Sequence, residues 1–431
     1  MQEKDLLNLI KKTIINKEFD KAISLVNNSN TTKIERNLKL RLLASIYFKK
    51  KDWENAVKYY EKVLSHSKDK YGIYNNIGIS YFNLGELEKS IDFYLKSIEN
   101  NQKFDVAHEN LAITYKNLDD YESAIKSFVK AFEINKNNKN ARNQIIYLLN
   151  YVKIKNKTIN PIIECDFKIN ELLKNLNFES IKSEKFLKNI FFKIDKIVDT
   201  YKSDFFLNET QIYRRNKENL NCTRHFKVFN RFKIIPKYCF NCYKIQIDLK
   251  NIVDLVKLNF LFNILKLEKN NIRKCIVEIR PNVPVNYKGY IYCESLDESQ
   301  EILENINNDL KKINFDKVKI ITKHGCSEFY DVYPKFKDIN YNGKQQMLYD
   351  VSWKKKEEII DKEINNVNSN KFFKKNTLKS INLYDVLIMK NWFAYAKIIE
   401  DKSLDKIYNG KLKLENLSPY LKDQLNFRKS N

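Results

Sequence analysis

The chain has 431 residues, 43% of them hydrophobic and 13% aromatic, which suffices for two or three folded domains and excludes general disorder. Its formal charge of +24 suits a nucleic-acid or other anionic partner, although a chain this rich in Lys, Asn and Ile is also what AT-rich coding produces. No apolar run approaches the roughly 18 residues of a membrane span. An odd cysteine count of 7 without an export signal predicts reduced thiols, a cytoplasmic protein and no membrane insertion.

A period of 34 residues runs through 37–138. Small residues recur at two of its positions and aromatic residues at two others. This pattern lets the two helices of a pair approach closely while rings fill the space between pairs. The positions in phase are Ala44, Gly78 and Ala112; Tyr47, Tyr81 and Tyr115; Ala56, Ser90 and Ala124; Tyr60, Tyr94 and Phe128; and Val63, Ser97 and Ala131.

These repeats resemble the tetratricopeptide (TPR) family over three full repeats, although the family's usual Trp and terminal Pro are missing. The resemblance implies an α-solenoid of helix pairs. Ala22 is in phase and places a degenerate repeat at 3–36, where Ile10 and Thr13 replace the expected small residue and Tyr. Residues 138–153 predict a capping helix, because an array cannot end on a bare apolar face.

TPR arrays commonly present a concave groove that holds a peptide, so the resemblance implies a protein or peptide partner for residues 1–153. Groove positions carried over by phase have side chains suited to a peptide backbone or an acidic tail. They are Arg41, Asn75, Asn76, Asn110 and Lys116, together with Ser45 and Glu109. Ser45 stands where the family's clamp for chaperone tails has Asn, so that ligand is not implied. A spacer or an oligomerisation surface is the alternative.

Residues 154–210 are expected to form a linker followed by bridging helices. Pro161 interrupts the helical pattern within 154–165. Apolar residues then return at mixed spacings of three and four over 166–202, which indicates helices.

Cysteine and histidine cluster at the start of the next region. Two residues separate Cys222 from His225, two separate Cys239 from Cys242, and thirteen lie between the pairs. Two such pairs joined by a loop are typical of tetrahedral Zn²⁺, and four protein ligands would make the zinc structural rather than catalytic. Buried free thiols or a reactive Cys/His pair are the alternatives.

The same stretch is strongly basic, with nine Lys or Arg residues and the single acid Glu218 in 211–247. It also resembles a set of TPR-linked proteins from marine microbes that have no known activity, so the resemblance implies a recurring architecture alone. The residues that carry it are Cys222, Arg224, His225, Ile235, Pro236, Cys239, Phe240, Cys242, Tyr243 and Lys244.

Six elements follow in an order that indicates an α+β domain. Alternating apolar residues predict strands, and Ser295 with Glu298 forms a capping box that opens the second helix. The order is β-α-β-β-α-β, the ferredoxin-like pattern, and predicts a zinc-stapled domain over 211–325. The strands are expected at 242–249, 273–281, 287–295 and 317–324, and the helices at 251–267 and 295–311.

The third of these strands resembles half of an RNA-recognition motif. Lys288, Gly289, Tyr290 and Tyr292 fit the motif, whereas Cys293, Ser295 and Gln246 depart from it. Strand alternation puts both tyrosines on one sheet face, where single-stranded RNA could stack unless later helices cover that face. This candidate RNA or ligand face contains Lys244, Gln246, Arg280, Tyr290 and Tyr292, beside Asp248 and Glu278.

Residues 326–431 are expected to form a helical extension packed on the second domain, with a helix near 344–364 and an amphipathic helix over 377–400. Motifs of phosphate-loop, zinc-protease and serine-hydrolase enzymes are absent from the sequence, which has only 7 Gly. His324 and Cys326 lie two apart, as a catalytic pair could.

The sequence therefore predicts an adaptor with no catalytic residues. A TPR groove would bind a protein, and a basic domain with structural zinc would bind a second ligand, with RNA as the candidate. The alternative is an enzyme for an anionic substrate. That alternative requires a pocket in which five residues converge: Arg214, Arg215, Arg224, His324 and Cys326.

Overall fold

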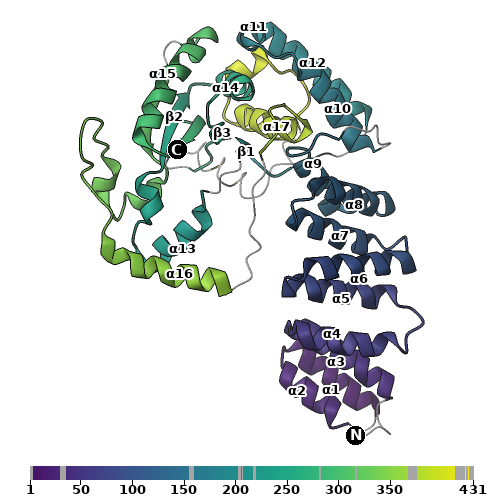
Figure 1. Cartoon of the computed structure of the whole chain (residues 1–431). Helices are drawn as coiled ribbons and strands as arrows, with labels where there is room; N and C mark the ends of the chain where they lie inside the picture. Colours follow the sequence, from purple (N-terminus) through teal and green to yellow (C-terminus); the bar gives the residue numbers. More distant parts are fainter. Residues whose placement is uncertain are drawn as a thin grey trace. The chain divides into compact units, whose positions relative to one another are not determined.

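The structure is a computed structural model. It describes residues 3–29, 35–154, 160–201, 205, 207–216, 220–280, 283–315, 318–366, 376–412, 423 and 426. The chain divides into two compact units, Met1–Ile145 (unit 1) and Ile146–Val367 with Phe373–Asn431 (unit 2) (Figure 1).

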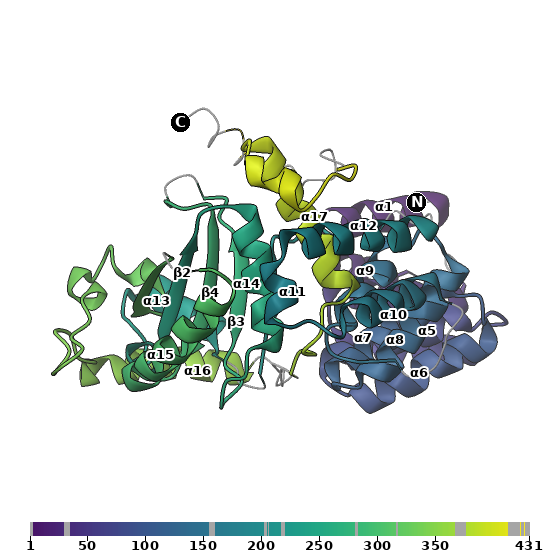
Figure 2. The ribbon, with the colours of Figure 1, turned by 90° about the horizontal axis from the view of Figure 1, so that it is seen from above.

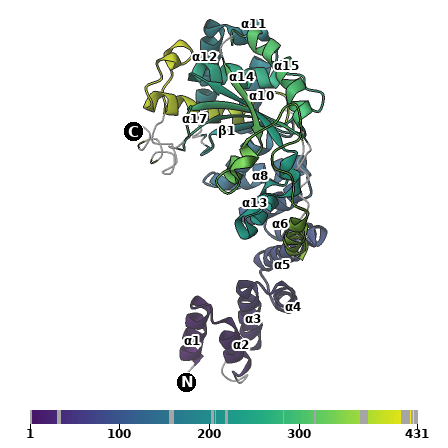
Figure 3. The same ribbon diagram turned by 90° about the vertical axis from the view of Figure 1, so that its left-hand side faces the viewer.

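Unit 1 is a helical solenoid in which each helix packs on the next one along the chain (Figure 3). Consecutive helices are joined by short turns and form pairs, as the 34-residue period predicts. The helices are α1 (Glu3–Ile15), α2 (Phe19–Asn27), α3 (Arg36–Lys50), α4 (Trp53–Leu64), α5 (Tyr71–Leu84), α6 (Leu87–Asn100), α7 (Asp105–Asn117) and α8 (Tyr121–Ile134), followed by α9 (Lys139–Leu148).

Small side chains at the periodic positions allow the helices of a pair to approach closely. Ala44, Ala112 and Ala56 are fully buried. A Cβ atom at Gly78 would lie 2.7 Å from ring carbons of Tyr94, so α5 and α6 can meet at this distance only because the residue is glycine. The in-phase residues therefore explain the packing of the array.

The first helix pair, α1 and α2, lies where the degenerate repeat is predicted. Ile10 and Ala22 are fully buried in its core. Thr13 is also buried, and its hydroxyl donates a hydrogen bond of 2.8 Å to the Ile10 carbonyl. Because its polar group is satisfied, the departure from the repeat pattern is tolerated.

Unit 2 combines a small antiparallel sheet with helices (Figure 2). Short 3₁₀ segments connect several of its elements. The main elements are α10 (Pro161–Leu173), α11 (Phe178–Lys182), α12 (Glu184–Thr200), β1 (Gln211–Arg214), α13 (Cys222–Phe232), β2 (Tyr243–Leu249), α14 (Ile252–Ile264), β3 (Arg273–Val277), β4 (Tyr287–Cys293), α15 (Leu296–Lys312), β5 (Lys319–His324), α16 (Lys354–Asn366) and α17 (Leu383–Ile398).

The sheet has the strand order β1-β3-β4-β2-β5, and every neighbouring pair is antiparallel. Helix α14 packs on one face of it, against β3 and β4. A Cβ atom at Gly289 would lie 2.2 Å from Leu258 of α14, so the glycine permits this contact. Tyr287, two residues earlier on β4, faces the same way and meets Tyr395 of α17 with ring centroids 6.1 Å apart. The alternate residues of β4 therefore point to the opposite face.

Helix α17 differs from its prediction, because it is buried on nearly all sides rather than amphipathic. Thirteen side chains between Leu383 and Ala396 are buried. It contacts α10, α14 and β1, all within unit 2. A helix surrounded in this way needs apolar residues around its whole circumference, and its Leu383–Ile398 sequence supplies them.

Two further predictions need correction, and one strand was missed. Pro161 begins α10 instead of interrupting a helix, because Pro is favourable at the first helical position and Asn160 caps the Ile162 N–H. The helix expected near 344–364 starts only at Lys354. Strand β1 was not predicted, since four residues are too few for a recognisable alternation.

None of the helices in the described part of the chain has both the length and the apolar character needed to cross a bilayer.

Candidate functional site: a basic cavity on the sheet

The sheet face opposite α14 carries a cavity of about 690 Å³, the sheet cavity. Its floor consists of cross-strand neighbours from all five strands. One row runs from β3 through β4 and β2 to β5, as Lys274, Tyr290, Gln246 and Ile321. The row on one side holds Tyr292, Lys244 and Lys323. The row on the other side holds Ile276, Lys288, Asp248 and Lys319.

Cations outnumber carboxylates on this lining. The positive side chains are Lys244, Lys274, Arg280, Lys288, Lys319 and Lys323, and the negative ones are Asp248, Glu278 and Glu328. Several of the lining side chains are buried, including Lys244 at 8% exposed and Lys288 at 2% exposed. Buried charges are costly unless paired, so the partners of each cation decide what the cavity can bind.

Glu278 neutralises one side of the cavity. Its carboxylate accepts hydrogen bonds of 2.8 Å from both Nε and a terminal nitrogen of Arg280, and lies 3.4 Å from the Lys288 ammonium. Burial alone would raise the pKa of Glu278, but the Arg280 hydrogen bonds and the Lys288 charge outweigh it and hold the pKa at about 2. The carboxylate therefore stays ionised at any physiological pH.

The other cations lack such a partner. Lys244 donates a hydrogen bond of 2.6 Å to the Gly325 carbonyl and lies over the Tyr290 ring, 5.3 Å from its centroid. Lys274 lies 5.0 Å from the same centroid and 5.4 Å from that of Tyr213. Within the described residues, no carboxylate forms an ion pair with Lys244, Lys274 or Lys323.

Burial, together with the charge of Lys244 beside each, lowers the pKa of Lys274 and of Lys323 to about 8. Lys244 and Lys323 are also directly opposite on β2 and β5, an arrangement in which like charges repel. The cavity thus holds positive charge that the protein itself compensates poorly.

Gln246 lies in the middle of this floor and is only 6% exposed. Its amide nitrogen donates a hydrogen bond of 2.6 Å to Asp248. Its amide oxygen is buried and has no hydrogen-bond partner among the described residues. A buried acceptor without a donor costs stability, so this oxygen favours a ligand that donates a hydrogen bond.

The structure brings together all five residues of the predicted ligand face, Lys244, Gln246, Arg280, Tyr290 and Tyr292, because each lines the sheet cavity. The face is not a flat stacking platform, since Tyr290 is only 6% exposed and two lysine ammonium groups lie against its ring. Sequence reasoning missed Lys274 and Lys323. The alternation that selected Glu278 and Arg280 also points to Lys274, whereas Lys323 required the register of β5.

The four predicted zinc ligands differ in their burial and in the side chains that surround them. Cys222 is exposed, whereas Cys239 and Cys242 are buried. The His225 ring stacks on Tyr238, with centroids 5.3 Å apart. Within the described ranges, no group of three or more His, Cys, Asp or Glu side chains is arranged to hold a metal ion.

Zinc binding remains a prediction that elemental analysis can test. If it is right, protein purified without chelator should contain about one zinc per chain, and Cys239→Ser should reduce that content because a thiolate ligand is lost. Cys165→Ser is a matched control, since Cys165 is a buried cysteine on α10, outside the Cys222–Cys242 stretch. Wild-type protein with substantially less than one zinc per chain would contradict the prediction.

The pocket required by the enzyme alternative is not assembled. Of its five residues, only Cys326 lines the sheet cavity. Arg214 is buried and paired with Asp385, and Arg224 is paired with Glu357 and Asp361. His324 is buried and stacks on Phe336 with ring centroids 4.0 Å apart.

The chemistry of the His324 and Cys326 pair is also unfavourable for catalysis. Burial raises the pKa of the Cys326 thiol to about 12 and lowers the pKa of His324 to about 4. A thiol with such a pKa is not ionised at neutral pH and is a poor nucleophile. Arg215, the fifth residue of that pocket, lies over the Tyr213 ring at 4.0 Å from its centroid.

The predicted groove residues of unit 1 all lie on the first helix of a pair, namely α3, α5 or α7. Several form hydrogen bonds to another helix or, for Arg41, to the turn that follows α4. Asn110 donates to Asn75 at 2.9 Å, Asn76 donates to the Tyr60 hydroxyl at 3.1 Å, and Arg41 donates to Ser67 at 2.9 Å. Lys116 donates to Gln144 of α9 at 2.9 Å. These bonds fix the side chains and help to hold successive pairs together.

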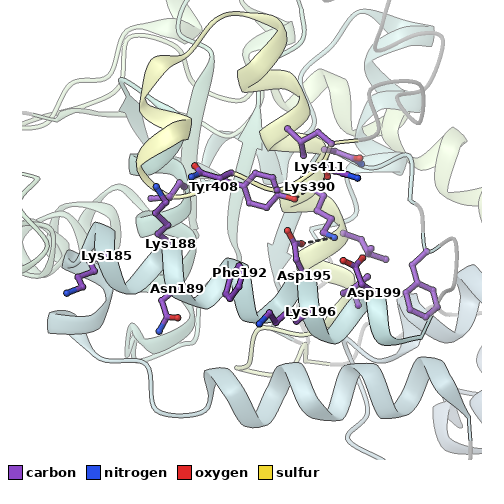
Figure 4. A pocket seen from close by; sticks show the side chains of 18 residues that line it. Lys185, Lys188, Asn189, Phe192, Asp195, Lys196, Asp199, Lys390, Tyr408 and Lys411 are labelled. Carbon is purple, nitrogen blue, oxygen red and sulfur yellow. Dashed lines mark hydrogen bonds and ion pairs between the residues drawn. The ribbon is translucent and has the colours of Figure 1, made fainter.

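A second cavity, of about 1070 Å³, lies between α12 and the segment after α17 (Figure 4). Its lysines are exposed, as Lys185 and Lys188 of α12 and Lys411 after α17 are, or paired, as Lys390 is with Asp195 at 2.9 Å. Its wall also contains Phe192, which is 58% exposed. The lysines of this cavity are solvated or paired, whereas those of the sheet cavity include cations without an ion-pair partner among the described residues, so the sheet cavity is the stronger candidate.

Known proteins resemble the first part of the chain. Residues 40–70, 71–104 and 93–126 each match a family model described as tetratricopeptide repeat. The chain carries TPR repeats. The matches end at residue 126, so they lend no support to the resemblance predicted for the Cys/His stretch at 222–242. No curated protein matches the chain.

Solved structures that resemble part of this TPR-containing chain include the following three. "Crystal structure of MamA" is 19% identical, covering 32% of this chain and 81% of that one at a TM-score of 0.30. "First TPR of Spaghetti (RPAP3) bound to HSP90 peptide SRMEEVD" is 20% identical, covering 26% and 90% at a TM-score of 0.25. "TPR2B-domain:pHsp70-complex of yeast Sti1" is 26% identical, covering 26% and 94% at a TM-score of 0.25.

Proposed function

We propose that this protein is an adaptor in which the TPR repeats of unit 1 bind a partner peptide and the sheet cavity of unit 2 binds an anionic ligand. The three matched repeats carry the first half of the proposal. The poorly compensated lysines of the sheet cavity support the second half. Enzymatic activity is not part of the proposal, because the five residues of the enzyme alternative do not share a pocket.

The peptide proposed for unit 1 is extended and acidic. Arg41 and Lys116 supply positive charge, and Asn76 and Asn110 supply amides that can pair with a peptide backbone. Hydrogen bonds within unit 1 hold these side chains in place before binding, which lowers the entropic cost of association.

Peptide binding can be measured by fluorescence anisotropy with the full chain. A labelled peptide with an acidic tail should bind, and its counterpart with lysines in place of the acids should not. The double variant Arg41→Ala/Lys116→Ala should weaken binding by roughly tenfold, as expected for the loss of two partly exposed charge contacts. Lys130→Ala, an exposed lysine of α8, is the matched control. Equal binding of both peptides, or no effect of the double variant, would reject the groove.

For unit 2 we infer a ferredoxin-like fold, supported by the succession β2, α14, β3, β4, α15 and β5 and by the adjacent order β3-β4-β2-β5. In this interpretation β1 is an addition at the β3 edge. The cavity then occupies the sheet face that the two helices of the motif leave uncovered. RNA is a weaker candidate for this face than a compact anion, because the Tyr290 ring is already contacted by lysines.

A further inference from the structure

We propose that the sheet cavity is a binding site for a small phosphorylated molecule whose phosphoryl group is held by Lys274, Lys323 and Lys244. This inference rests on the second half of the proposed function and specifies its ligand. Three features of the described residues support it: the position of the cations, the burial of the floor and the unpartnered oxygen of Gln246.

The first feature is the convergence of the three lysines. They come from β3, β5 and β2, and all three line one cavity of about 690 Å³. The carboxylates of the same cavity, Asp248, Glu278 and Glu328, form no direct ion pair with these lysines among the described residues, and Glu278 is engaged by Arg280 and Lys288. A dianion such as a phosphate ester is the ligand that several converging ammonium groups recognise best.

The second feature is the burial of the floor. Lys244, Gln246 and Tyr290 are each less than a tenth exposed, so a ligand there would leave most of its hydration shell. Charge interactions strengthen when water is excluded. A solvated surface patch would not have a buried floor of this kind, and the size of the cavity suits a small molecule.

The third feature is the Gln246 amide oxygen, which is buried and has no partner among the described residues. Gln246 is opposite Tyr290 on β4 and Ile321 on β5, at the centre of the floor. A sugar hydroxyl or an amino group next to the phosphate would donate the missing hydrogen bond. The ligand class is therefore a phosphate ester with a neighbouring donor, such as a sugar phosphate or a nucleotide.

The proposal can be tested by isothermal titration of the full chain at low salt with ribose 5-phosphate as the probe. Binding is expected for the wild type and for Lys274→Arg, which keeps the charge. Lys274→Met and Lys323→Met should each weaken binding by about tenfold or more. Lys312→Met, an exposed lysine of α15, should bind as the wild type does. Melting curves verify that each variant is folded.

Two further arms identify the source of the phosphoryl group. Ribose without phosphate should not bind. A single-stranded RNA with a 5′-phosphate should bind no better than the free sugar phosphate, and removing its 5′-phosphate should abolish whatever binding it has at this site. RNA that binds equally with and without the 5′-phosphate, while ribose 5-phosphate does not bind, would overturn the proposal in favour of a nucleic-acid surface.

Other results would also overturn it. These are no binding of ribose 5-phosphate by folded wild-type protein, or unchanged binding by both lysine-to-methionine variants. Gln246→Glu gives an independent check, because a carboxylate at the centre of the floor should repel the phosphate and abolish binding. Peptide binding by unit 1 is read in a separate assay with separate variants, so failure here is distinguishable from failure of the groove.

Discussion

Asp385→Asn should lower the free energy of unfolding of unit 2 by about 3–5 kcal/mol, the largest loss expected from a single substitution that preserves side-chain size. Arg214 is 4% exposed and Asp385 is fully buried. The two are joined by hydrogen bonds of 2.6 and 3.1 Å, and Arg214 also donates to Asn263 at 2.7 Å. Without the carboxylate, the guanidinium would remain buried and uncompensated.

Urea unfolding of the full chain, followed by a probe of unit 2, measures this effect. The double variant Arg214→Met/Asp385→Asn should recover most of the lost stability, because it removes both charges. It also leaves an amide at the start of α17, where the Asp385 side chain accepts a hydrogen bond from the Asn382 backbone N–H. Glu363→Gln is the matched control. Its partner Arg231 is 50% exposed, so that pair should contribute less than about 1 kcal/mol. A loss below about 1 kcal/mol for Asp385→Asn would contradict the expectation.

The ion pair between Arg214 and Asp385 is an example of a contact that could not be predicted from the sequence. Arg214 belongs to a basic stretch that reads as solvent-facing, and Asp385 is 171 residues away. No sequence feature near Arg214 or near Asp385 predicts that these two residues form an ion pair. The pairing depends on α17 packing beside β1, a tertiary contact between a helix predicted to be amphipathic and a strand too short to be predicted.

Elements with their own periodic signal were predicted well. The 34-residue period located the helix pairs of unit 1, because each pair packs only on its neighbours and its sequence contains most of what determines it. The strands β2 to β5 followed from alternation, and Gly289 and Tyr290 were assigned to opposite faces. Residues 344–353 were wrongly included in a helix, since their polar and aromatic composition has no regular period.

The candidate site was predictable only in part. Alternation within a strand identifies which side chains share a face, and this selected Lys244, Gln246, Arg280, Tyr290 and Tyr292. It does not give the register between strands, so the proximity of Lys323 to Lys244 could not be foreseen. Nor does it reveal burial, which makes the expected stacking platform the floor of a cavity in which Tyr290 is only 6% exposed.

Lys274→Met, in contrast to Asp385→Asn, should stabilise unit 2 at neutral pH, by about 2–3 kcal/mol in the absence of ligand. Burial holds the pKa of Lys274 at about 8, below its ordinary value of 10.5, and the charges of Lys244 on β2, Arg280 and Arg215 act in the same direction. Glu278 opposes this shift, and the flanking rings of Tyr213 and Tyr290 stay neutral because burial raises the pKa of each.

The direction in which the stability of unit 2 changes with pH follows from proton binding at Lys274. Between pH 8 and about 10.5 the unfolded chain binds more protons at Lys274 than the folded chain does, so wild-type stability should rise with pH across this window. Below pH 8 both states are protonated, and the full cost of burying the charge remains. The advantage of Lys274→Met over the wild type should therefore be greatest below pH 8 and shrink as the pH approaches 10.

Melting temperatures of the two proteins at pH 7 and pH 10 test this expectation. The variant should melt several degrees higher at pH 7 and nearly with the wild type at pH 10. Lys312→Met, which removes an exposed lysine, should show no such pH dependence. If Lys274→Met instead destabilises unit 2 at pH 7, the Lys274 ammonium is compensated within the protein itself. A lysine that costs stability in the free protein and is needed for phosphate binding would serve the ligand, whereas Arg214 serves the fold.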